Sequence, residues 1–151
     1  MSDGLIRVCP AMRDEAEALA AISAAEHDSW SADQFISTIE DPLARVWSAR
    51  GNDDRTVGYA AVYYDSGGSE LAQIAVDPDC RRQGIATALL DAALAFLREE
   101  GVPQIMLEVR SRNDGAIPFY RRNGFEQAVV VRDFYRDPQD DALRMTRDVD
   151  R

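Results

Sequence analysis

The chain has 151 residues, with 27 acidic side chains against 17 basic ones and a formal net charge of −10. This length can bury one continuous core, so we expect a single domain over residues 1–151. The acidic balance argues against a general nucleic-acid surface or an anionic-membrane surface and favours a cationic partner. No apolar run approaches 18 residues and the first ten residues lack the pattern of a secretory signal, so we expect a cytoplasmic protein.

Residue types that mark other kinds of site are scarce. All 17 basic residues are arginine, which fits either salt adaptation or GC-rich codon usage, and the two remain open. Cys9 and Cys80 lie far apart and form no CxxC pair, so free thiols are expected. Because His27 is the single histidine and no Cys/His cluster occurs, we expect no metal site, and His27 itself is expected to be structural or solvated.

The N-terminal third predicts one strand and two helices. Residues 5–8 alternate apolar and polar side chains as a half-buried strand does, and a helical pattern follows over residues 10–22. Ser31, with Gln34 three residues later, forms a capping box, so a second helix starts there. That helix ends before Pro42, because the residue preceding a proline is pushed out of the helical region.

Two strands follow, and then a strand that leads directly into a long helix. Residues 44–50 and 56–64 flank a polar turn and favour an antiparallel hairpin. The next strand ends at Val76, a turn and the basic loop Arg81–Ala86 come after it, and apolar residues then recur at helical spacing over residues 85–97.

The junction between that strand and that helix favours a bound anion. The first N–H groups of a helix lack intrahelical partners and lie at the positive end of the helix dipole. Gly84 and Ala86 leave the backbone accessible to a diphosphate, and Arg81 and Arg82 add positive charge. A surface turn with two solvated arginines is the alternative, because one glycine loop is a weak signal.

The C-terminal third predicts a crossover and two closing strands. Residues 104–110 form a strand that follows the helix and completes a right-handed βαβ unit. A short helix is expected over residues 115–122, then strands over 125–131 and 142–147 joined by the polar loop 137–141. The predicted fold is α/β (α+β), with a mixed, mainly antiparallel sheet of about seven strands, a central parallel βαβ unit and about four helices.

Four motifs in this order resemble the GNAT superfamily of acetyl-CoA-dependent N-acetyltransferases: IAVDP, RRQGIA, LEVRSRN and IPFYRRNGF. Within it the chain is similar to the RimI-type enzymes, through Trp30-Ser31, the Glu108-Val109-Arg110 run and Tyr135. That group acetylates the N-terminal alanine of a small-subunit ribosomal protein. The resemblance therefore implies direct acetyl transfer to a protein N-terminus, in a complex of enzyme, acetyl-CoA and acceptor.

The resemblance also implies roles for single residues. Glu108 is the expected general base and Tyr120, twelve residues later, the expected general acid. Pro118 beside that tyrosine and Ala86, where many members have glycine, are departures from the family pattern. The residues expected to hold acetyl-CoA are Ile74, Ala75, Val76, Arg81, Arg82, Gln83, Gly84, Ile85, Ala86, Thr87, Asn113 and Tyr120.

The chemistry suits an α-amine. An α-amino group with a pKa near 7.7 to 8.0 is about a tenth neutral at pH 7, whereas a lysine near 10.4 is neutral by less than about a thousandth. A weakly basic Glu108 acting through a water is therefore sufficient for an N-terminus. Tyr120 is less simple, because a proton moves uphill by about 2 kcal/mol from a phenol to a thiolate, so a hydrogen bond is the alternative role.

The acceptor itself is left open by the sequence. An acidic rim favours a basic protein or peptide N-terminus, and the expected walls are Asp28, Trp30, Tyr63, Tyr135 and the loop Asp137–Asp141. A small polyamine, an antibiotic or a lysine side chain would suit the same charge. A non-catalytic module that binds CoA or a protein partner is the alternative from another class, and Glu108 together with Tyr120 argues against it.

Overall fold

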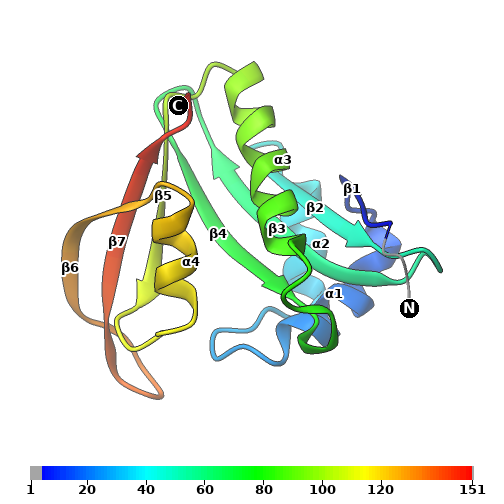
Figure 1. Cartoon of the computed structure of the whole chain (residues 1–151), viewed down its shortest axis with the longest axis horizontal. Helices are drawn as coiled ribbons and strands as arrows, with labels where there is room; N and C mark the ends of the chain where they lie inside the picture. Colours follow the sequence, from blue (N-terminus) through cyan, green and yellow to red (C-terminus); the bar gives the residue numbers. More distant parts are fainter. Residues whose placement is uncertain (1–4, 151) are drawn as a thin grey trace.

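The structure is a computed structural model and describes residues 5–150, so the expected domain 1–151 extends beyond it at both ends. Within the described residues, seven strands form one sheet in the order β1-β2-β3-β4-β5-β7-β6, with four α-helices (Figure 1). The strands are β1 Arg7–Pro10, β2 Ala44–Arg50, β3 Thr56–Tyr64, β4 Ser69–Val76, β5 Gln104–Arg110, β6 Glu126–Tyr135 and β7 Asp140–Asp148. The helices are α1 Ala16–Ser23, α2 Ala32–Glu40, α3 Ile85–Glu99 and α4 Ala116–Arg122, with 3₁₀ turns η1 Arg13–Glu15 and η2 Pro78–Cys80. The predicted fold class is confirmed.

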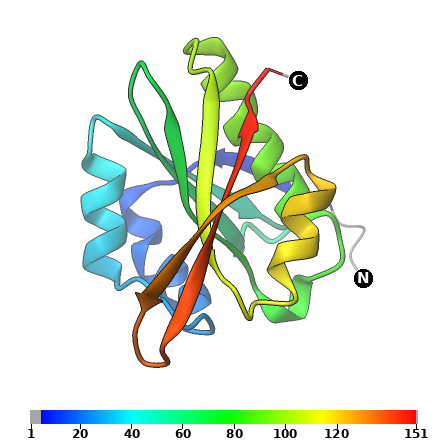
Figure 2. The same ribbon diagram turned by 90° about the vertical axis from the view of Figure 1, so that its left-hand side faces the viewer.

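The sheet is covered on both faces. Helices α1 and α2 lie on one face, and α3 and α4 lie on the other (Figure 2). Successive residues of the central strand β3 alternate between the two cores, since Tyr59 and Ala61 pack toward α1 and α2 whereas Ala60 and Val62 pack toward α3. No helix within residues 5–150 is long and apolar enough to cross a membrane.

Strands β4 and β5 stay together over only part of their length. They pair in parallel through Ser69 with Ile105 and Glu70 with Met106, and β4 then changes register against β3 near Leu71. The two strands diverge beyond that point (Figure 1). The edge of β4 facing β5 consequently has no neighbouring strand over residues 72–76, so its peptide groups remain available for a ligand.

The predicted cap of the second helix is confirmed. The N–H of Gln34 donates to Ser31 Oγ at 3.2 Å, and the N–H of Ser31 donates to Gln34 Oε1 at 2.8 Å. The ring of Trp30 then meets Phe35 edge-on at 5.3 Å between centroids. This pair fixes the direction in which the chain enters α2.

The first strand and first helix begin later than predicted. Pro10 belongs to β1, where it is paired with Trp47, instead of opening a helix. Met12 is extended, and its N–H donates to the Glu15 side chain at 2.8 Å, which closes the 3₁₀ turn η1 before α1 starts. The apolar spacing alone does not distinguish this turn from a first helical turn.

The last two strands are longer than predicted, and the expected loop 137–141 is correspondingly shorter. Strand β6 continues to Tyr135 and pairs with Asp140, the first residue of β7. Asp140 is buried because its carboxylate accepts hydrogen bonds from Ser111 Oγ and from the Arg112 N–H. These bonds satisfy an acidic side chain that sequence patterns assign to a loop.

Candidate active site

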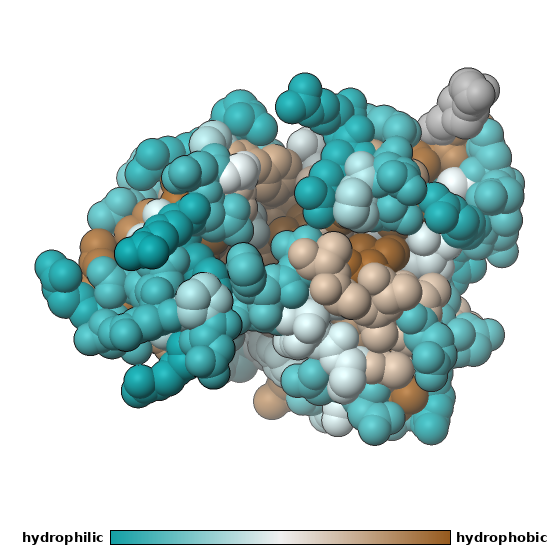
Figure 3. Space-filling model, turned by 90° about the horizontal axis from the view of Figure 1, so that it is seen from below, coloured by the Kyte–Doolittle hydropathy of each residue, from teal (hydrophilic) through white to brown (hydrophobic). Residues whose placement is uncertain are grey.

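A cavity of about 1010 Å³ lies where β4 and β5 diverge, between the N-terminus of α3 and helix α4. Seen from below, it is a hollow with apolar residues inside and polar residues along its rim (Figure 3). The structure brings most of the predicted cofactor residues to this cavity and leaves only Gln83 outside its lining. The predicted residues that line it are Ile74, Ala75, Val76, Arg81, Arg82, Gly84, Ile85, Ala86, Thr87, Asn113 and Tyr120.

One end of the cavity is built for an anion. Gly84 precedes α3 with φ +77°, and Arg82 also has positive φ, so the loop turns sharply where it lines the cavity. The first amide of α3 to bond within the helix is that of Ala88, which donates to the Gly84 carbonyl at 3.0 Å. The N–H groups of residues 85–87 therefore have no intrahelical partner, and a diphosphate fits there.

Replacing Gly84 by aspartate is expected to raise the dissociation constant for CoA about tenfold or more. Aspartate is one of the few residues that visit left-handed backbone, and a Cβ at Gly84 meets nothing within 4 Å, so the substitution adds backbone strain but no clash while a negative charge enters the anion site. The matched control is Gly101→Asp, because Gly101 has φ +74° and equal space at the far end of α3. Calorimetric titration with CoA checks this, and equal affinities for both variants would contradict it.

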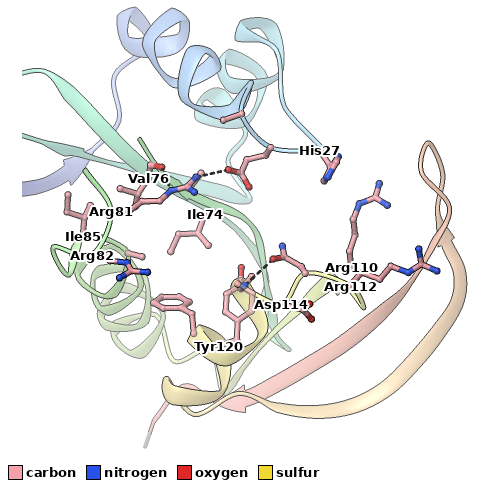
Figure 4. A pocket seen from close by; sticks show the side chains of 18 of the residues that line it. His27, Ile74, Val76, Arg81, Arg82, Ile85, Arg110, Arg112, Asp114 and Tyr120 are labelled. Atoms are coloured by element: carbon pink, nitrogen blue, oxygen red, sulfur yellow. Dashed lines mark hydrogen bonds and ion pairs between the residues drawn. The ribbon is translucent and has the colours of Figure 1, made fainter. Parts of the chain in front are cut away.

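The cavity continues along the end of β4. Arg81 Nε donates to the Val76 carbonyl at 3.2 Å, and Arg81 Nη2 lies 3.3 Å from a Glu26 carboxylate oxygen (Figure 4). The basic loop is thereby tied both to the strand end and to the loop between α1 and α2. Asn113 caps α4, since its Oδ1 accepts from the Ala116 N–H at 3.0 Å.

Tyr120 projects from α4 toward the end of β4 (Figure 4). Its ring packs edge-on against Phe125 at 5.8 Å. Burial raises the pKa of the Tyr120 phenol above its ordinary value, and the negative charge of Glu26 adds to the rise. The phenol is therefore protonated throughout the neutral range and is available as a hydrogen-bond donor.

Glu108 lies outside the cavity lining. Its side chain is 12% exposed and accepts two hydrogen bonds from Arg144, at 3.0 Å from Nε and 2.5 Å from Nη2. Both bonds end on Oε2, and no hydrogen bond from the described residues reaches Oε1. Glu108 shares a sheet face with Arg110, which does line the cavity, so it lies about 7 Å along β5 from the cavity wall.

Only some of the residues that were expected to form the acceptor walls line the cavity. Pro138 and Gln139 of the turn between β6 and β7 line the cavity together with Asp140, the first residue of β7. Asp28, Trp30, Tyr63 and Tyr135 do not line it. His27, expected to be structural or solvated, is exposed and lies at the cavity's edge (Figure 4). Sequence reasoning missed this placement because nothing in the pattern of the α1–α2 loop fixes its position.

Arg110 is a second cavity residue that was not predicted as part of the site. It lies on the polar face of β5, two residues after Glu108, and its side chain is 8% exposed. Alternation along the strand places it on the correct face, but an arginine is usually solvated there. Arg110 is buried because its hydrogen-bond partners lie on two loops that are distant in sequence.

A splayed mixed sheet with the N-terminus of a helix at the point of divergence is an arrangement that can bind a diphosphate-containing ligand. A family model described as the acetyltransferase (GNAT) family matches residues 10–125, and the chain belongs to that family. The ribosomal protein bS18-alanine N-acetyltransferase of Escherichia coli strain K12 is 43% identical over 77 residues, which cover 50% of this chain and 52% of that protein. The Salmonella typhimurium enzyme of the same name is 37% identical over 95 residues, covering 62% of this chain and 64% of that protein.

A likeness in structure extends over nearly the whole chain. The crystal structure of the ribosomal-protein-S18-alanine N-acetyltransferase from Escherichia coli has a TM-score of 0.86 at 28% identity, covering 96% of this chain and 94% of that one. The sequence matches are shorter, since they span about half to two thirds of the length of these curated relatives.

Proposed function

We propose that the protein is an N-acetyltransferase that transfers the acetyl group of acetyl-CoA to the α-amino group of a protein N-terminus. The observation that carries this proposal is one continuous cavity, which runs from the anion-binding end of α3 along the free edge of β4 to Tyr120. Similarity to enzymes named for acetylating the alanine of a ribosomal protein supports the acceptor class. A cytoplasmic location and a ribosomal protein as acceptor belong to the same proposal.

The chain's own residues hold each part of the co-substrate. The amides of residues 85–87 and the loop from Arg81 to Gly84 take the diphosphate. The peptide groups of residues 74–76 take the pantetheine arm as an added strand would be taken, and Asn113 contacts it from the α4 side. Acetyl-CoA, when bound, supplies the acetyl group as a thioester.

Two side chains assist the reaction, one by proton transfer and one by a hydrogen bond. Glu108 accepts the proton of the attacking amine through a water, since Oε1 is not engaged by Arg144. Tyr120 donates a hydrogen bond to the sulfur as it becomes a thiolate. Full transfer of the phenol proton to a thiolate with pKa near 8.5 is uphill by about 2 kcal/mol at an ordinary phenol pKa, and burial makes it more so.

Replacing Tyr120 by phenylalanine is expected to lower kcat by about 10- to 100-fold without changing the KM for acetyl-CoA. A hydrogen bond to a charged group contributes roughly 1.5–3 kcal/mol, and this one forms only as the sulfur gains charge. Tyr64→Phe is the control, because Tyr64 packs against Phe96 in the C-terminal half of α3, and neither residue lines the cavity at the N-terminus of that helix. Steady-state kinetics of the wild type and both variants measure the effect. A kcat for Tyr120→Phe equal to that of Tyr64→Phe would refute this role of Tyr120.

The acceptor is tested with a peptide panel read as CoA released. Peptides beginning with alanine, serine, glycine or methionine, each followed by basic residues, are compared with spermidine, an aminoglycoside and N-acetyl-lysine amide, whose only amine is its side chain. Turnover of peptides, with a KM that rises with salt, is expected because the chain carries a net charge of −10. If only the free amines are acetylated, the acceptor is a small amine or a lysine side chain and not a peptide N-terminus. If CoA binds and no amine is acetylated, the protein is a non-catalytic binding module.

A further inference from the structure

A buried arginine joins two loops that border the acceptor end of the cavity. Arg110 Nε and Nη2 donate to the two carboxylate oxygens of Asp28, each at 2.9 Å, so the pair is bidentate. Arg110 Nη1 also donates to the Pro138 carbonyl at 2.7 Å, and Nη2 donates to the Arg136 carbonyl at 3.3 Å. Its guanidinium carbon lies 4.3 Å from the centre of the Tyr135 ring.

These partners come from segments far apart in sequence. Asp28 belongs to the loop between α1 and α2, whereas Arg136 and Pro138 belong to the turn between β6 and β7. Arg110 ends β5, between the two segments, and points toward the rim where His27 lies (Figure 4). No backbone hydrogen bond within residues 5–150 links the two loops directly, so Arg110 is the polar connection between them.

The α1–α2 loop has separate anchors on either side of His27. Glu26 pairs with Arg81 of the anion-binding loop, and the side chain of Asp28 pairs with Arg110. Gln73 of β4 fixes the backbone, since its Nε2 donates to the Asp28 carbonyl. The loop thus spans the cavity from its cofactor end to its acceptor end, and only the acceptor-side anchor depends on Arg110.

We propose that Arg110 is a positioning residue for the acceptor, and that its pair with Asp28 holds the α1–α2 loop and the β6–β7 turn at one fixed separation. The two loops then form opposite walls of the acceptor entrance. A planar guanidinium can bind a carboxylate with two donors while a further donor reaches a carbonyl, which a lysine ammonium cannot do in one plane. This inference rests on the proposed transfer to a peptide N-terminus.

The test compares Arg110→Lys and Asp28→Asn with the wild type, using a basic peptide with an N-terminal alanine. Both variants are expected to raise the KM for the peptide by roughly 10- to 100-fold, because loosened walls no longer hold the amine in line. The KM for acetyl-CoA is expected to stay unchanged. Asp28→Asn is the milder variant, because Asp28 is half-exposed and an asparagine oxygen can still accept a hydrogen bond from Arg110; thermal unfolding of both variants identifies any loss of fold.

Three comparisons separate positioning from a general structural role. Arg50→Lys weakens another buried Arg–Glu pair, neither member of which lines the cavity, and should leave both KM values unchanged. Asp28→Glu should recover part of the peptide affinity, and the double variant Arg110→Lys/Asp28→Asn should be no worse than the poorer single variant. Additive losses, or equal losses of affinity for both substrates, would overturn the proposal.

Failure of this inference is distinguishable from failure of the proposed function. A wild-type protein that turns over no peptide refutes the acceptor class. A wild-type protein that turns over peptides, with Arg110→Lys and Asp28→Asn variants that keep its peptide KM, refutes the positioning role alone.

Discussion

Replacing Glu108 by glutamine is expected to lower kcat by about 10²- to 10⁴-fold, the usual contribution of a general base. Glutamine keeps the shape of the side chain and can still accept from Arg144, but its amide cannot take a proton. The KM for acetyl-CoA should not change, because Glu108 lies outside the cavity that is expected to bind it. Steady-state kinetics across pH, with thermal unfolding of both proteins, measure the effect.

The ion pair with Arg144 offers a competing explanation for this carboxylate. If Glu108 serves only to pair with Arg144, the glutamine variant should lose stability and keep the wild-type kcat. Glu99→Gln, at an exposed position near the end of α3, controls for the loss of one negative charge and should behave as the wild type. A normal kcat for Glu108→Gln would require another group to take the amine proton.

Replacing Glu15 by glutamine is expected to have the largest effect on stability. The Glu15 side chain is 10% exposed and accepts from Arg50 Nη2 at 2.7 Å and Nε at 3.1 Å, and it also accepts from Ser48 and Thr56. Removing one member of a buried pair costs roughly 3–5 kcal/mol, because the remaining charge stays buried. For a chain of this size, Tm should fall by roughly 6–20 °C.

The pH dependence of that loss has a definite sign. Burial acts to raise the pKa of Glu15, but the hydrogen bonds from Arg50, the Met12 N–H, Thr56 and Ser48 outweigh it and hold the pKa below its ordinary value. The pair therefore stabilises the fold fully above the unfolded pKa of about 4.3, and this contribution is lost as the pH falls through the folded pKa.

Denaturation by urea at several pH values measures this dependence. The stability difference between the wild type and Glu15→Gln should be largest near neutral pH and shrink below about pH 4. Glu17→Gln, on the exposed side of α1, should show no such difference. A constant gap between wild type and Glu15→Gln at all pH values would mean that the ionised carboxylate is not what stabilises the fold.

Local signals in the sequence predicted most of the helices and strands, and also the loop before α3 that lines the cavity. The Ser31 capping box, the apolar spacing of α3 and Gly84 before its first turn are each decided by neighbours a few residues away, which a sequence displays directly. The antiparallel hairpin of β2 and β3 and the parallel crossover from β4 to β5 were predicted as well, whereas the full strand order and the register were not. The structure confirms both predicted pairings.

The acceptor half could not be predicted to the same degree, because its contacts join distant segments. Arg110 pairs with Asp28, 82 positions away, and nothing in either neighbourhood distinguishes that arginine from a solvated one. The partnership of Glu108 with Arg144 depends on β5 lying beside β7, which only the assembled sheet fixes. The start of β7 was placed two residues late for a similar reason, since the buried Asp140 accepts a hydrogen bond from Ser111 in the loop after β5.

The divergence of β4 from β5 has a consequence for how the sequence can change over evolutionary time. Along residues 74–76 a ligand would form hydrogen bonds with backbone N–H and C=O groups. Every residue except proline provides both groups. Substitutions there need to preserve an extended strand and to fit the two cores, in which Ala75 and Val76 are buried, but they need not supply a particular side chain to the ligand. Selection for a particular acceptor would instead act on side chains such as Arg110 and Asp28, where a single substitution changes which amine can bind.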